Sequence, residues 1–299
     1  MKVLVIGGSY FLGRVFVMLA SKEHELTLIN RGTYSMSEFG VTEYKLDRND
    51  IEALKRLPKE DYDVVIDFCA YNPNEVRKII TYLPGNIQKY VLISTADVYE
   101  REIEGKKVEE ISLSTILYEG EAGTYIHGKI QLEKELIKEC GEKKISYAIL
   151  RPAIIYGPYN YAPRESEYIR EIIQEGKVIF PKNADGKFQF VYVKDVANAI
   201  LQIMQKNEEE QIYNICSSEI SDYSSFLAVL KKVSTYPFET EYATIEQILQ
   251  KGIFAPFPLT KEETELYDGT KFEEKFGFKY TALEDGMKKT FKAFENVFK

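Results

Sequence analysis

Short apolar runs recur at regular intervals through the first half of this 299-residue chain. They are rich in Val and Ile and comprise Val3–Ile6, Leu26–Ile29, Val64–Phe68, Tyr90–Ile93 and Tyr147–Leu150. Segments with helical spacing of apolar residues lie between most of them, such as Leu12–Ala20 and Val76–Leu83. Strands that are apolar along their whole length and alternate with helices indicate a parallel sheet buried on both faces. The sequence therefore predicts an α/β fold with a doubly wound parallel sheet.

The charge and the cysteine content exclude several classes of function. The net charge is -8 and the pI is near 5.2, which disfavours nucleic acid as the main partner because such binding draws on clustered Lys and Arg. The three cysteines are far apart and there are two histidines, so we expect no metal site and no disulfide. The chain starts directly with an apolar run, and no stretch reaches the ~20 apolar residues of a membrane span. We therefore expect a cytoplasmic protein without membrane contact.

A glycine-containing loop, Gly7 to Gly13, follows the first apolar run and precedes the first predicted helix. A strand, a glycine turn and a helix in this order present backbone N–H groups and a helix N-terminus to a pyrophosphate. Gly13 falls in the first helical turn, where the missing side chain lets helix and strand pack closely. Tyr10 breaks the strict G-x-G-x-x-G pattern, but the position of the loop still favours dinucleotide binding.

Further motifs follow in a fixed order, and with the loop they resemble one family. They are Ser94-Thr95-Ala96-Asp97-Val98-Tyr99, Tyr125-Ile126-His127-Gly128-Lys129, Arg151-Pro152, Tyr156-Gly157-Pro158, the run 190–197, and Tyr213-Asn214-Ile215. Over roughly residues 2–217 the chain resembles the extended or atypical short-chain dehydrogenases/reductases of the NAD-dependent epimerase/dehydratase family. The resemblance implies a Rossmann fold with a smaller C-terminal substrate lobe. Residues 1–158 would form the NAD(P)-binding core, with further core elements near 190–217, and residues 159–299 mainly the substrate-binding lobe.

The sequence holds two Tyr-x-x-x-Lys pairs, Tyr125/Lys129 and Tyr267/Lys271. With 22 tyrosines and lysine at roughly one residue in ten, chance alone gives about two such spacings. On a helix this spacing puts phenol and ammonium on one face, where the lysine charge favours tyrosinate. The resemblance points to Tyr125 and Lys129 as the catalytic pair, and to Thr95 as the hydroxyl that hydrogen-bonds the reacting oxygen.

The loop and the resemblance together predict the cofactor-binding residues. These are Gly7, Ser9, Tyr10, Phe11, Leu12, Gly13, Asn30, Arg31, Asp47, Phe68, Cys69, Ala70, Ser94, Tyr125 and Lys129. NAD-selective proteins carry an acid at the end of the second strand, where it repels a 2′-phosphate. Here Asn30 is uncharged and Arg31 offers a planar fork of donors for phosphate, so we expect NADP(H) to be preferred over NAD(H).

The resemblance implies transient oxidation of a sugar or nucleotide-sugar carbon, followed by return of the hydride. The predicted substrate-binding residues are Asp97, Tyr156, Tyr159, Arg164 and Lys187. The family's dehydratases carry an acidic pair after the threonine, whereas this chain has Ala96-Asp97, which weakens a dehydratase assignment. Many epimerases have an arginine for the substrate diphosphate where this chain reads Lys187-Phe188-Gln189, and Lys187 would be an imperfect substitute.

Two functions of other classes remain as alternatives. A noncatalytic protein that senses NADP(H) would use the same fold, but such regulators usually lack the Tyr/Lys pair. Some atypical members that resemble the loop of this chain are linked to RNA binding, which the acidic charge disfavours. Family members also often form homodimers through two helices, which here would be about 125–140 and 74–83.

Overall fold

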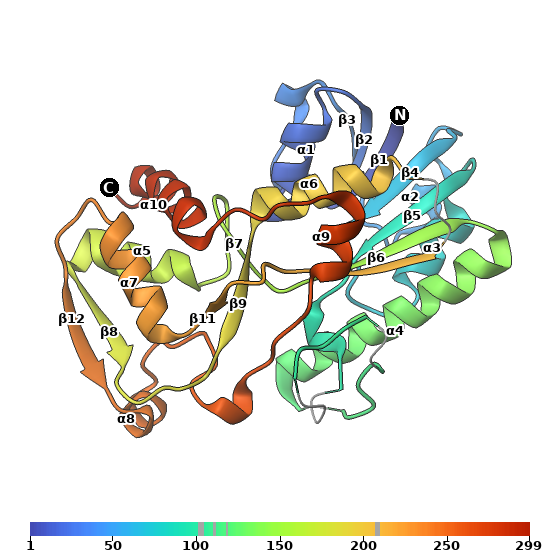
Figure 1. The fold of residues 1–299 in the computed structure, drawn as a ribbon. Coiled ribbons are helices and arrows are strands. Elements are labelled where there is room, and N and C mark those ends of the chain that lie inside the picture. The colour runs from blue at the N-terminus through green and yellow to red at the C-terminus, as the bar shows by residue number, and fades with distance from the viewer. Residues whose placement is uncertain (101–104, 110–111, 118, 207–209) are drawn as a thin grey trace.

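The computed structural model of the protein describes residues 1–100, 105–109, 112–117, 119–206 and 210–299. Seven strands form one sheet in the order β10-β6-β5-β4-β1-β2-β3, and every pair of neighbours is parallel (Figure 1). The strands are β1 (Lys2–Ile6), β2 (Glu25–Asn30), β3 (Thr42–Lys45), β4 (Tyr62–Asp67), β5 (Ile87–Ile93), β6 (Ser146–Pro152) and β10 (Glu210–Ile215). The predicted doubly wound sheet is confirmed.

Helices cover both faces of this sheet. One face is covered by α1 (Phe11–Ala20) and α6 (Val193–Met204), and the other by α2 (Ile51–Lys55), α3 (Glu75–Tyr82) and α4 (Gly120–Lys143). Successive strand side chains point to opposite faces, so Val3 and Val5 join the first core while Leu4 and Ile6 join the second. This is why the strands read as continuous apolar runs rather than as alternating ones.

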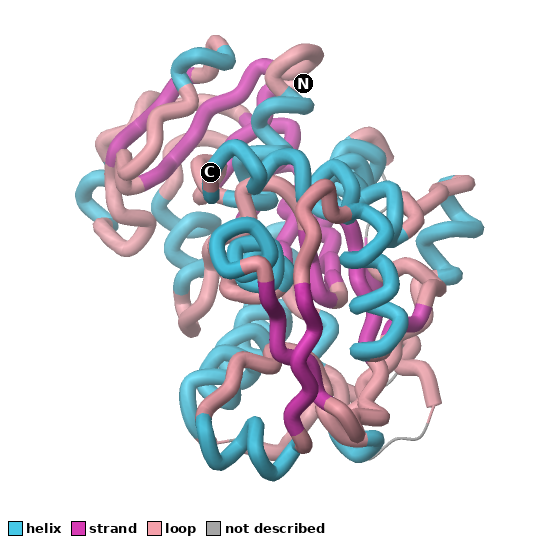
Figure 2. Tube along the Cα trace, turned by 90° about the vertical axis from the view of Figure 1, so that its left-hand side faces the viewer, coloured by secondary structure: helices cyan, strands magenta, loops and turns pink. Residues whose placement is uncertain are grey.

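The C-terminal half contributes elements both to the sheet and to a smaller lobe. Strand β10 and helices α6 and α9 (Thr270–Phe276) pack with the main sheet. The smaller lobe contains a three-stranded sheet of β7 (Ile154–Tyr156), β9 (Phe188–Tyr192) and β11 (Ile220–Ser221), and a parallel pair of β8 (Lys177–Pro181) and β12 (Glu239–Ala243). Seen from the side of the smaller lobe, β8 and β12 lie in front of the main sheet (Figure 2).

Aromatic rings fill the core of the smaller lobe. Phe226 contacts the rings of Tyr168, Phe180, Phe190 and Phe257 at centroid distances between 5.3 and 6.2 Å. The surrounding helices are α5 (Glu165–Glu175), α7 (Tyr223–Val233), α8 (Ile245–Lys251) and α10 (Leu283–Phe298), and short 3-10 turns are η1 (Ser37–Phe39), η2 (Ala96–Val98) and η3 (Lys261–Glu263). The aromatic content that the sequence concentrates here thus serves packing.

Within the described residues no helix has both the length and the apolar character needed to cross a membrane. The same part of the chain shows no group of three or more His, Cys, Asp or Glu side chains placed to hold a metal ion.

Candidate active site

A cavity of about 970 Å³ lies at the carboxyl edge of the main sheet and extends to the smaller lobe. The carboxyl edge is where open α/β sheets bind ligands. Of the predicted residues, those that line it are Gly7, Ser9, Tyr10, Phe11, Leu12, Gly13, Asn30, Arg31, Asp47, Phe68, Cys69, Ser94, Thr95, Asp97, Tyr125, Lys129 and Arg164. Ala70, Tyr156, Tyr159 and Lys187 are not part of its wall. The cavity therefore joins segments that lie far apart in the sequence.

The loop Gly7 to Gly13 packs as tightly as its glycines permit. A Cβ at Gly13 would lie 2.7 Å from the carbonyl oxygen of Gly7, and Gly7 has a φ of +88°. Tyr10 has an extended backbone, with φ -122° and ψ 151°, so a side chain is accommodated where the family pattern has glycine. No side chain caps the N-terminus of α1. The N–H groups of its first turn can therefore face an anion.

Lys129 is almost fully buried beneath the cavity, at 2% exposed. Its Nζ donates to the carbonyl oxygens of Ala70 and Ile93, both at 2.8 Å. Ala70 thus contributes through its backbone, although its side chain lies in the core. Burial lowers the pKa of Lys129 to about 8, because leaving water disfavours the charged form.

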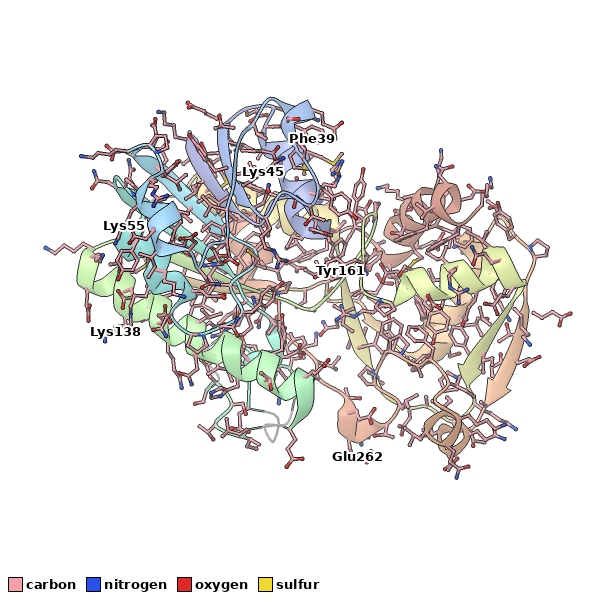
Figure 3. All side chains as sticks on the ribbon, turned by 180° about the vertical axis from the view of Figure 1, so that it is seen from behind. Phe39, Lys45, Lys55, Lys138, Tyr161 and Glu262 are labelled. Atoms are coloured by element: carbon pink, nitrogen blue, oxygen red, sulfur yellow. The ribbon has the colours of Figure 1, made fainter. Side chains whose placement is uncertain are left out.

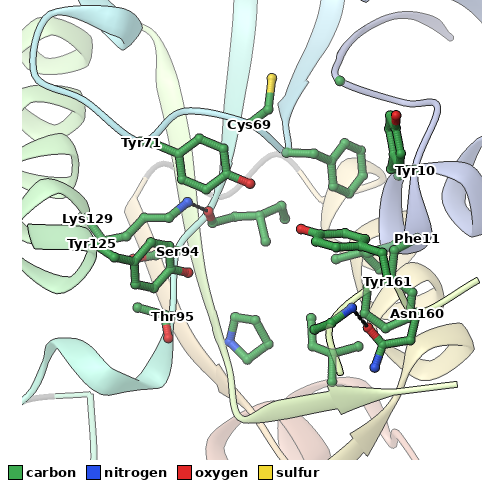
Figure 4. A pocket seen from close by; sticks show the side chains of 18 of the residues that line it. Tyr10, Phe11, Cys69, Tyr71, Ser94, Thr95, Tyr125, Lys129, Asn160 and Tyr161 are labelled. Carbon is green, nitrogen blue, oxygen red and sulfur yellow. Dashed lines mark hydrogen bonds between the residues drawn. The ribbon is translucent and has the colours of Figure 1, made fainter. Parts of the chain in front are cut away.

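Tyr125 lies one helical turn before Lys129 on α4, and both point into the cavity (Figure 4). The Lys129 Nζ is 5.8 Å from the centre of the Tyr125 ring. Burial and the charge of Asp97 raise the pKa of Tyr125 to about 12, whereas the nearby Thr95 hydroxyl acts in the opposite direction. Thr95 Oγ1 also donates to Asp97 Oδ2 at 2.9 Å. Thr95, Tyr125 and Lys129 therefore lie together, as the resemblance implied.

Ser94 faces a buried ion pair that fixes α4 to the sheet. Its hydroxyl donates to Glu133 Oε1. Glu133 is fully buried and accepts two hydrogen bonds from Arg151, at 3.1 and 2.6 Å. Since Glu133 is on α4 and Arg151 is on β6, the pair locks the helix that carries Tyr125 and Lys129 onto the strand beside it.

The end of β2 presents Arg31 to the cavity. The Asn30 side chain accepts from the Gly32 amide at 2.8 Å and donates to Glu43 Oε1 at 3.1 Å. Glu43, which the sequence reasoning did not consider, also accepts from Ser35 and the Met36 amide, and it is not part of the wall. Arg31 is exposed, lines the cavity and forms no ion pair with another described residue.

A second buried ion pair, missed by the sequence reasoning, borders the same part of the cavity. Arg48 donates to both carboxylate oxygens of Asp67 at 2.6 and 2.7 Å, and to the carbonyl of Glu75 at 3.0 Å. Tyr90 donates its hydroxyl to the same carboxylate. Burial alone would raise the pKa of Asp67, but Arg48 and these hydrogen bonds hold it below its usual value.

The wall on the side of the smaller lobe differs from the predicted one. Tyr156 is 1% exposed, and a Cβ at Gly286 would lie 1.9 Å from its hydroxyl, so Tyr156 is a core residue. Tyr159 lies outside the wall with its ring near Arg14, and Lys187 is exposed. The wall there instead includes Phe188, Gln189, Pro256, Pro258 and Tyr267. Gln189 hydrogen-bonds the backbone of Tyr267 and Ser217, so its amide serves the local fold.

Two tyrosines of the wall, Tyr71 and Tyr267, were not predicted to line it, whereas Tyr161 had been considered for the pocket and is part of the wall. Tyr161 lies at the junction of the two lobes (Figure 3). Tyr267 donates to Asp97 Oδ1 at 3.2 Å, but it precedes α9 and so shares no helix face with Lys271. The only sequence signal for Tyr71 is its place directly after the strand end Phe68-Cys69-Ala70.

The order of the seven strands, with a glycine loop between β1 and α1, defines a Rossmann-type protein whose cavity lies at the carboxyl edge. The sequence profile of the NAD dependent epimerase/dehydratase family matches residues 3–216. The chain belongs to this family, as the sequence predicted.

Individual proteins show how far the similarity extends. The chain is 26% identical over 253 residues to the chloroplast stem-loop binding protein of 41 kDa b of Arabidopsis thaliana, covering 79% of this chain and 64% of that protein. The chain thus spans less than two thirds of that relative. Its structure resembles UDP-glucose 4-epimerase from Thermotoga maritima, solved with UDP-glucose, with a TM-score of 0.78, 21% identity and full coverage of both chains. It also resembles dTDP-glucose 4,6-dehydratase from Bacillus anthracis str. Ames in complex with NAD, with a TM-score of 0.77, 20% identity, and coverage of 99% and 97%. At these identities the likeness to the two structures shows the fold.

Proposed function

We propose that this protein is an NAD(P)-dependent enzyme that acts on a sugar or nucleotide-sugar carbon through hydride transfer. The observation that carries the proposal is a single cavity that holds both the glycine loop and the group Thr95, Tyr125 and Lys129. Membership of the epimerase/dehydratase family and its nucleotide-sugar structural neighbours support the substrate class.

The residues of the cavity fit a dinucleotide. The uncapped N-terminus of α1 and the close-packed glycines suit the pyrophosphate, and the ends of β2 and β3 suit the adenosine half. When bound, the nicotinamide supplies the group that accepts a hydride from the substrate carbon and returns it. Lys129 lies beneath the cavity, where its charge can also orient a ribose.

Tyr125 moves the proton in this proposal. Its phenolate takes the proton of the substrate hydroxyl as the carbon is oxidised, and the phenol returns that proton on reduction. The charge of Lys129 favours the phenolate, and Thr95 hydrogen-bonds the same oxygen. Burial and Asp97 raise the pKa of Tyr125 to about 12, so the resting phenol is protonated at neutral pH, which is the form that donates its proton on reduction.

Ala96 stands where the family's dehydratases carry the acidic partner of Asp97, which favours epimerisation or reduction over dehydration. Asp97 is bonded to both Thr95 and Tyr267. Elimination of water needs one group to remove a proton from carbon and a second to protonate the leaving hydroxyl, and a single carboxylate offers one such role. This agrees with the missing partner of Asp97 in the sequence.

A screen for a bound or converted ligand tests the proposed function directly. Mass spectrometry of the protein as purified should detect NAD(P) or a sugar nucleotide, and a panel of nucleotide sugars and free sugars should include one that is converted only when cofactor is present. Arg164 lines the wall and forms no ion pair with another described residue, so Arg164→Gln should weaken binding of an anionic substrate. If neither NAD(H) nor NADP(H) binds, the proposed function is wrong.

RNA binding is the second candidate, because the name of the Arabidopsis relative states stem-loop binding. The net charge of -8 opposes it, since such affinity depends on Lys and Arg facing phosphates. Titration of a labelled stem-loop RNA at low and high salt decides between the two. Tight, salt-dependent binding without cofactor would favour this candidate. If the Tyr/Lys pair instead proved dispensable for every NADP(H)-dependent effect, the noncatalytic sensor of NADP(H) would be favoured.

We propose that NADP(H) binds at least about tenfold more tightly than NAD(H), a difference of about 1.4 kcal/mol. Arg31 is the charged donor at the end of β2, and the adjoining Glu43 is held by other groups outside the wall. Arg31→Ala should remove most of the difference, whereas Arg56→Ala, an exposed arginine outside the cavity, should not. Titration of each protein with both cofactors measures this, and equal affinities in the unmodified protein would contradict it.

We also propose a homodimer formed through α3 and α4. These helices pack together on one face of the sheet, and Ile137 is a large apolar side chain exposed on α4, at 39%. An apolar residue at the centre of a helical interface is costly to replace by a charge, so Ile137→Glu should shift a dimer to monomer. Light scattering at high micromolar concentration measures the mass, and a monomeric unmodified protein would rule the dimer out.

A further inference from the structure

Tyr71 is held against α4 by its backbone. A Cβ at Gly128 would lie 2.2 Å from the carbonyl oxygen of Tyr71, so this close approach requires the glycine. The amide of Tyr71 donates to Glu75 Oε2 at 2.7 Å, and Glu75 is itself 5% exposed and bonded to Asn49 and Asn72. The carbonyl just before it, that of Ala70, accepts from Lys129. The residue is thus anchored on both sides.

The Tyr71 ring lies on the ammonium of Lys129. The Nζ atom is 4.8 Å from the ring centre, and the ring centres of Tyr71 and Tyr125 are 6.1 Å apart (Figure 4). Burial, and to a smaller extent the neighbouring Tyr161, raises the pKa of Tyr71 well above its usual value. Tyr71 is therefore a neutral phenol that cannot take part as a base.

A shallow groove lies on the other side of the same ring. Tyr71 and Tyr125 line both the main cavity and this groove, which Asn72, Gly120, Glu121 and Thr124 complete. Tyr71 is 42% exposed, whereas Lys129 behind it is 2% exposed. The ring thus stands between the ammonium and the solvent of the groove.

The chemistry of an ammonium explains what this ring can do. Lys129 has three N–H donors, and two of them are used by the carbonyls of Ala70 and Ile93. An aromatic face attracts a cation without accepting its proton and replaces the water that would otherwise surround it. Tyr125 needs a nearby charge that is held still and poorly screened, since both conditions strengthen its effect on the phenol.

We propose that Tyr71 is a positioning residue of this site: its ring holds the Lys129 ammonium against the two carbonyls and closes it off from the outer groove. This inference rests on the proposed role of Lys129 as the electrostatic partner of Tyr125. The ring itself touches the lysine rather than any reacting atom. Tyr71→Phe keeps the ring, whereas Tyr71→Leu and Tyr71→Met remove it.

Competitive labelling of lysines tests this without any substrate. The protein is treated with acetic anhydride from about pH 7 to about pH 11, and peptide mass spectrometry gives for each lysine a midpoint of labelling and a plateau rate. Tyr71→Leu should raise the plateau of Lys129 several-fold, because the reagent gains access, and move its midpoint up by about one pH unit, because water again stabilises the charge. Tyr71→Phe should change neither value.

Lys89 provides the matched control inside the same molecule. It is also buried, at 5% exposed, and donates to two backbone carbonyls, of Ile203 and Lys206. Its labelling should stay constant in every variant, and a change at Lys89 would identify a folding defect, in which case Tyr71→Met replaces Tyr71→Leu. An unchanged plateau and midpoint of Lys129 in a folded ring-free variant would overturn the proposal. Titration with cofactor is done separately, so a failure to bind NAD(P) rejects the proposed function without deciding the role of Tyr71.

Discussion

Tyr125→Phe is expected to lower turnover by about a thousandfold, within the range that a positioned acid or base contributes. In the proposed function the phenol is the group that exchanges the proton, and it lies in the same cavity as Thr95 and Lys129, whose Nζ is 5.8 Å from the centre of its ring. Phenylalanine retains the ring and its contact with Tyr71 but cannot exchange a proton. Affinity for the cofactor should change by less than about threefold, a fraction of 1 kcal/mol.

The measurement compares initial rates, with saturating cofactor, on a substrate that the unmodified protein converts. Tyr242→Phe is the control, because Tyr242 is exposed on β12 in the smaller lobe and lies outside the cavity. Its rate should equal that of the unmodified protein. Near-normal turnover by Tyr125→Phe would show that another group moves the proton, and the assignment of the pair would then have to be abandoned.

The sheet and the glycine loop were predictable because both depend on local sequence. Strand runs such as Val3–Ile6 are apolar throughout, and parallel strands buried on two faces have no other pattern. The loop follows one of these strands directly, so close packing of Gly13 in the first helical turn could be predicted from its position. In the structure Gly13 packs against Gly7. The helical segments predicted at Leu12–Ala20 and Val76–Leu83 agree to within one residue at each end with α1 and α3. The order of motifs along the chain, rather than any single one, pointed to the family.

The rest of the site depends on contacts between segments distant in sequence. Tyr71 lies near Lys129 only because Gly128 lets two segments approach, and a lone tyrosine after a strand carries no local signal of that. Tyr156 was assigned to substrate by its motif, but the packing of α10 through Gly286 covers it. Tyr267 and Lys271 have the same spacing in the sequence as Tyr125 and Lys129. In the structure they serve different places, because Tyr267 lines the cavity whereas Lys271 packs near the ring of Tyr213. Tertiary packing decided each of these positions.

Arg48 is another residue whose role depends on a contact distant in sequence. Asp47 was predicted to bind the cofactor, but it is the next residue, Arg48, that is 7% exposed and paired with the fully buried Asp67. Arg48→Met should lower the free energy of unfolding at pH 7 by about 3–5 kcal/mol, because Asp67 would remain buried without its counter-ion. Urea unfolding measures this loss.

The pH dependence of that loss separates an uncompensated charge from simple loss of packing. In the unmodified protein the pKa of Asp67 is held below its usual value. The stability that the pair contributes is therefore fully present above the pKa of an unfolded Asp, about 3.9. It is lost only as the pH falls through the lower pKa of the folded state. In Arg48→Met burial raises the pKa of Asp67 instead, and the folded state takes up a proton as the pH falls. The destabilisation should therefore be smaller at pH 5 than at pH 7.

Adding Asp67→Asn to Arg48→Met should recover most of the loss at pH 7, because the amide still accepts from Tyr90 or the Cys69 amide without a charge. A loss that is equal at both pH values, and that the double variant does not reduce, would mean that the arginine acts through its packing rather than its charge.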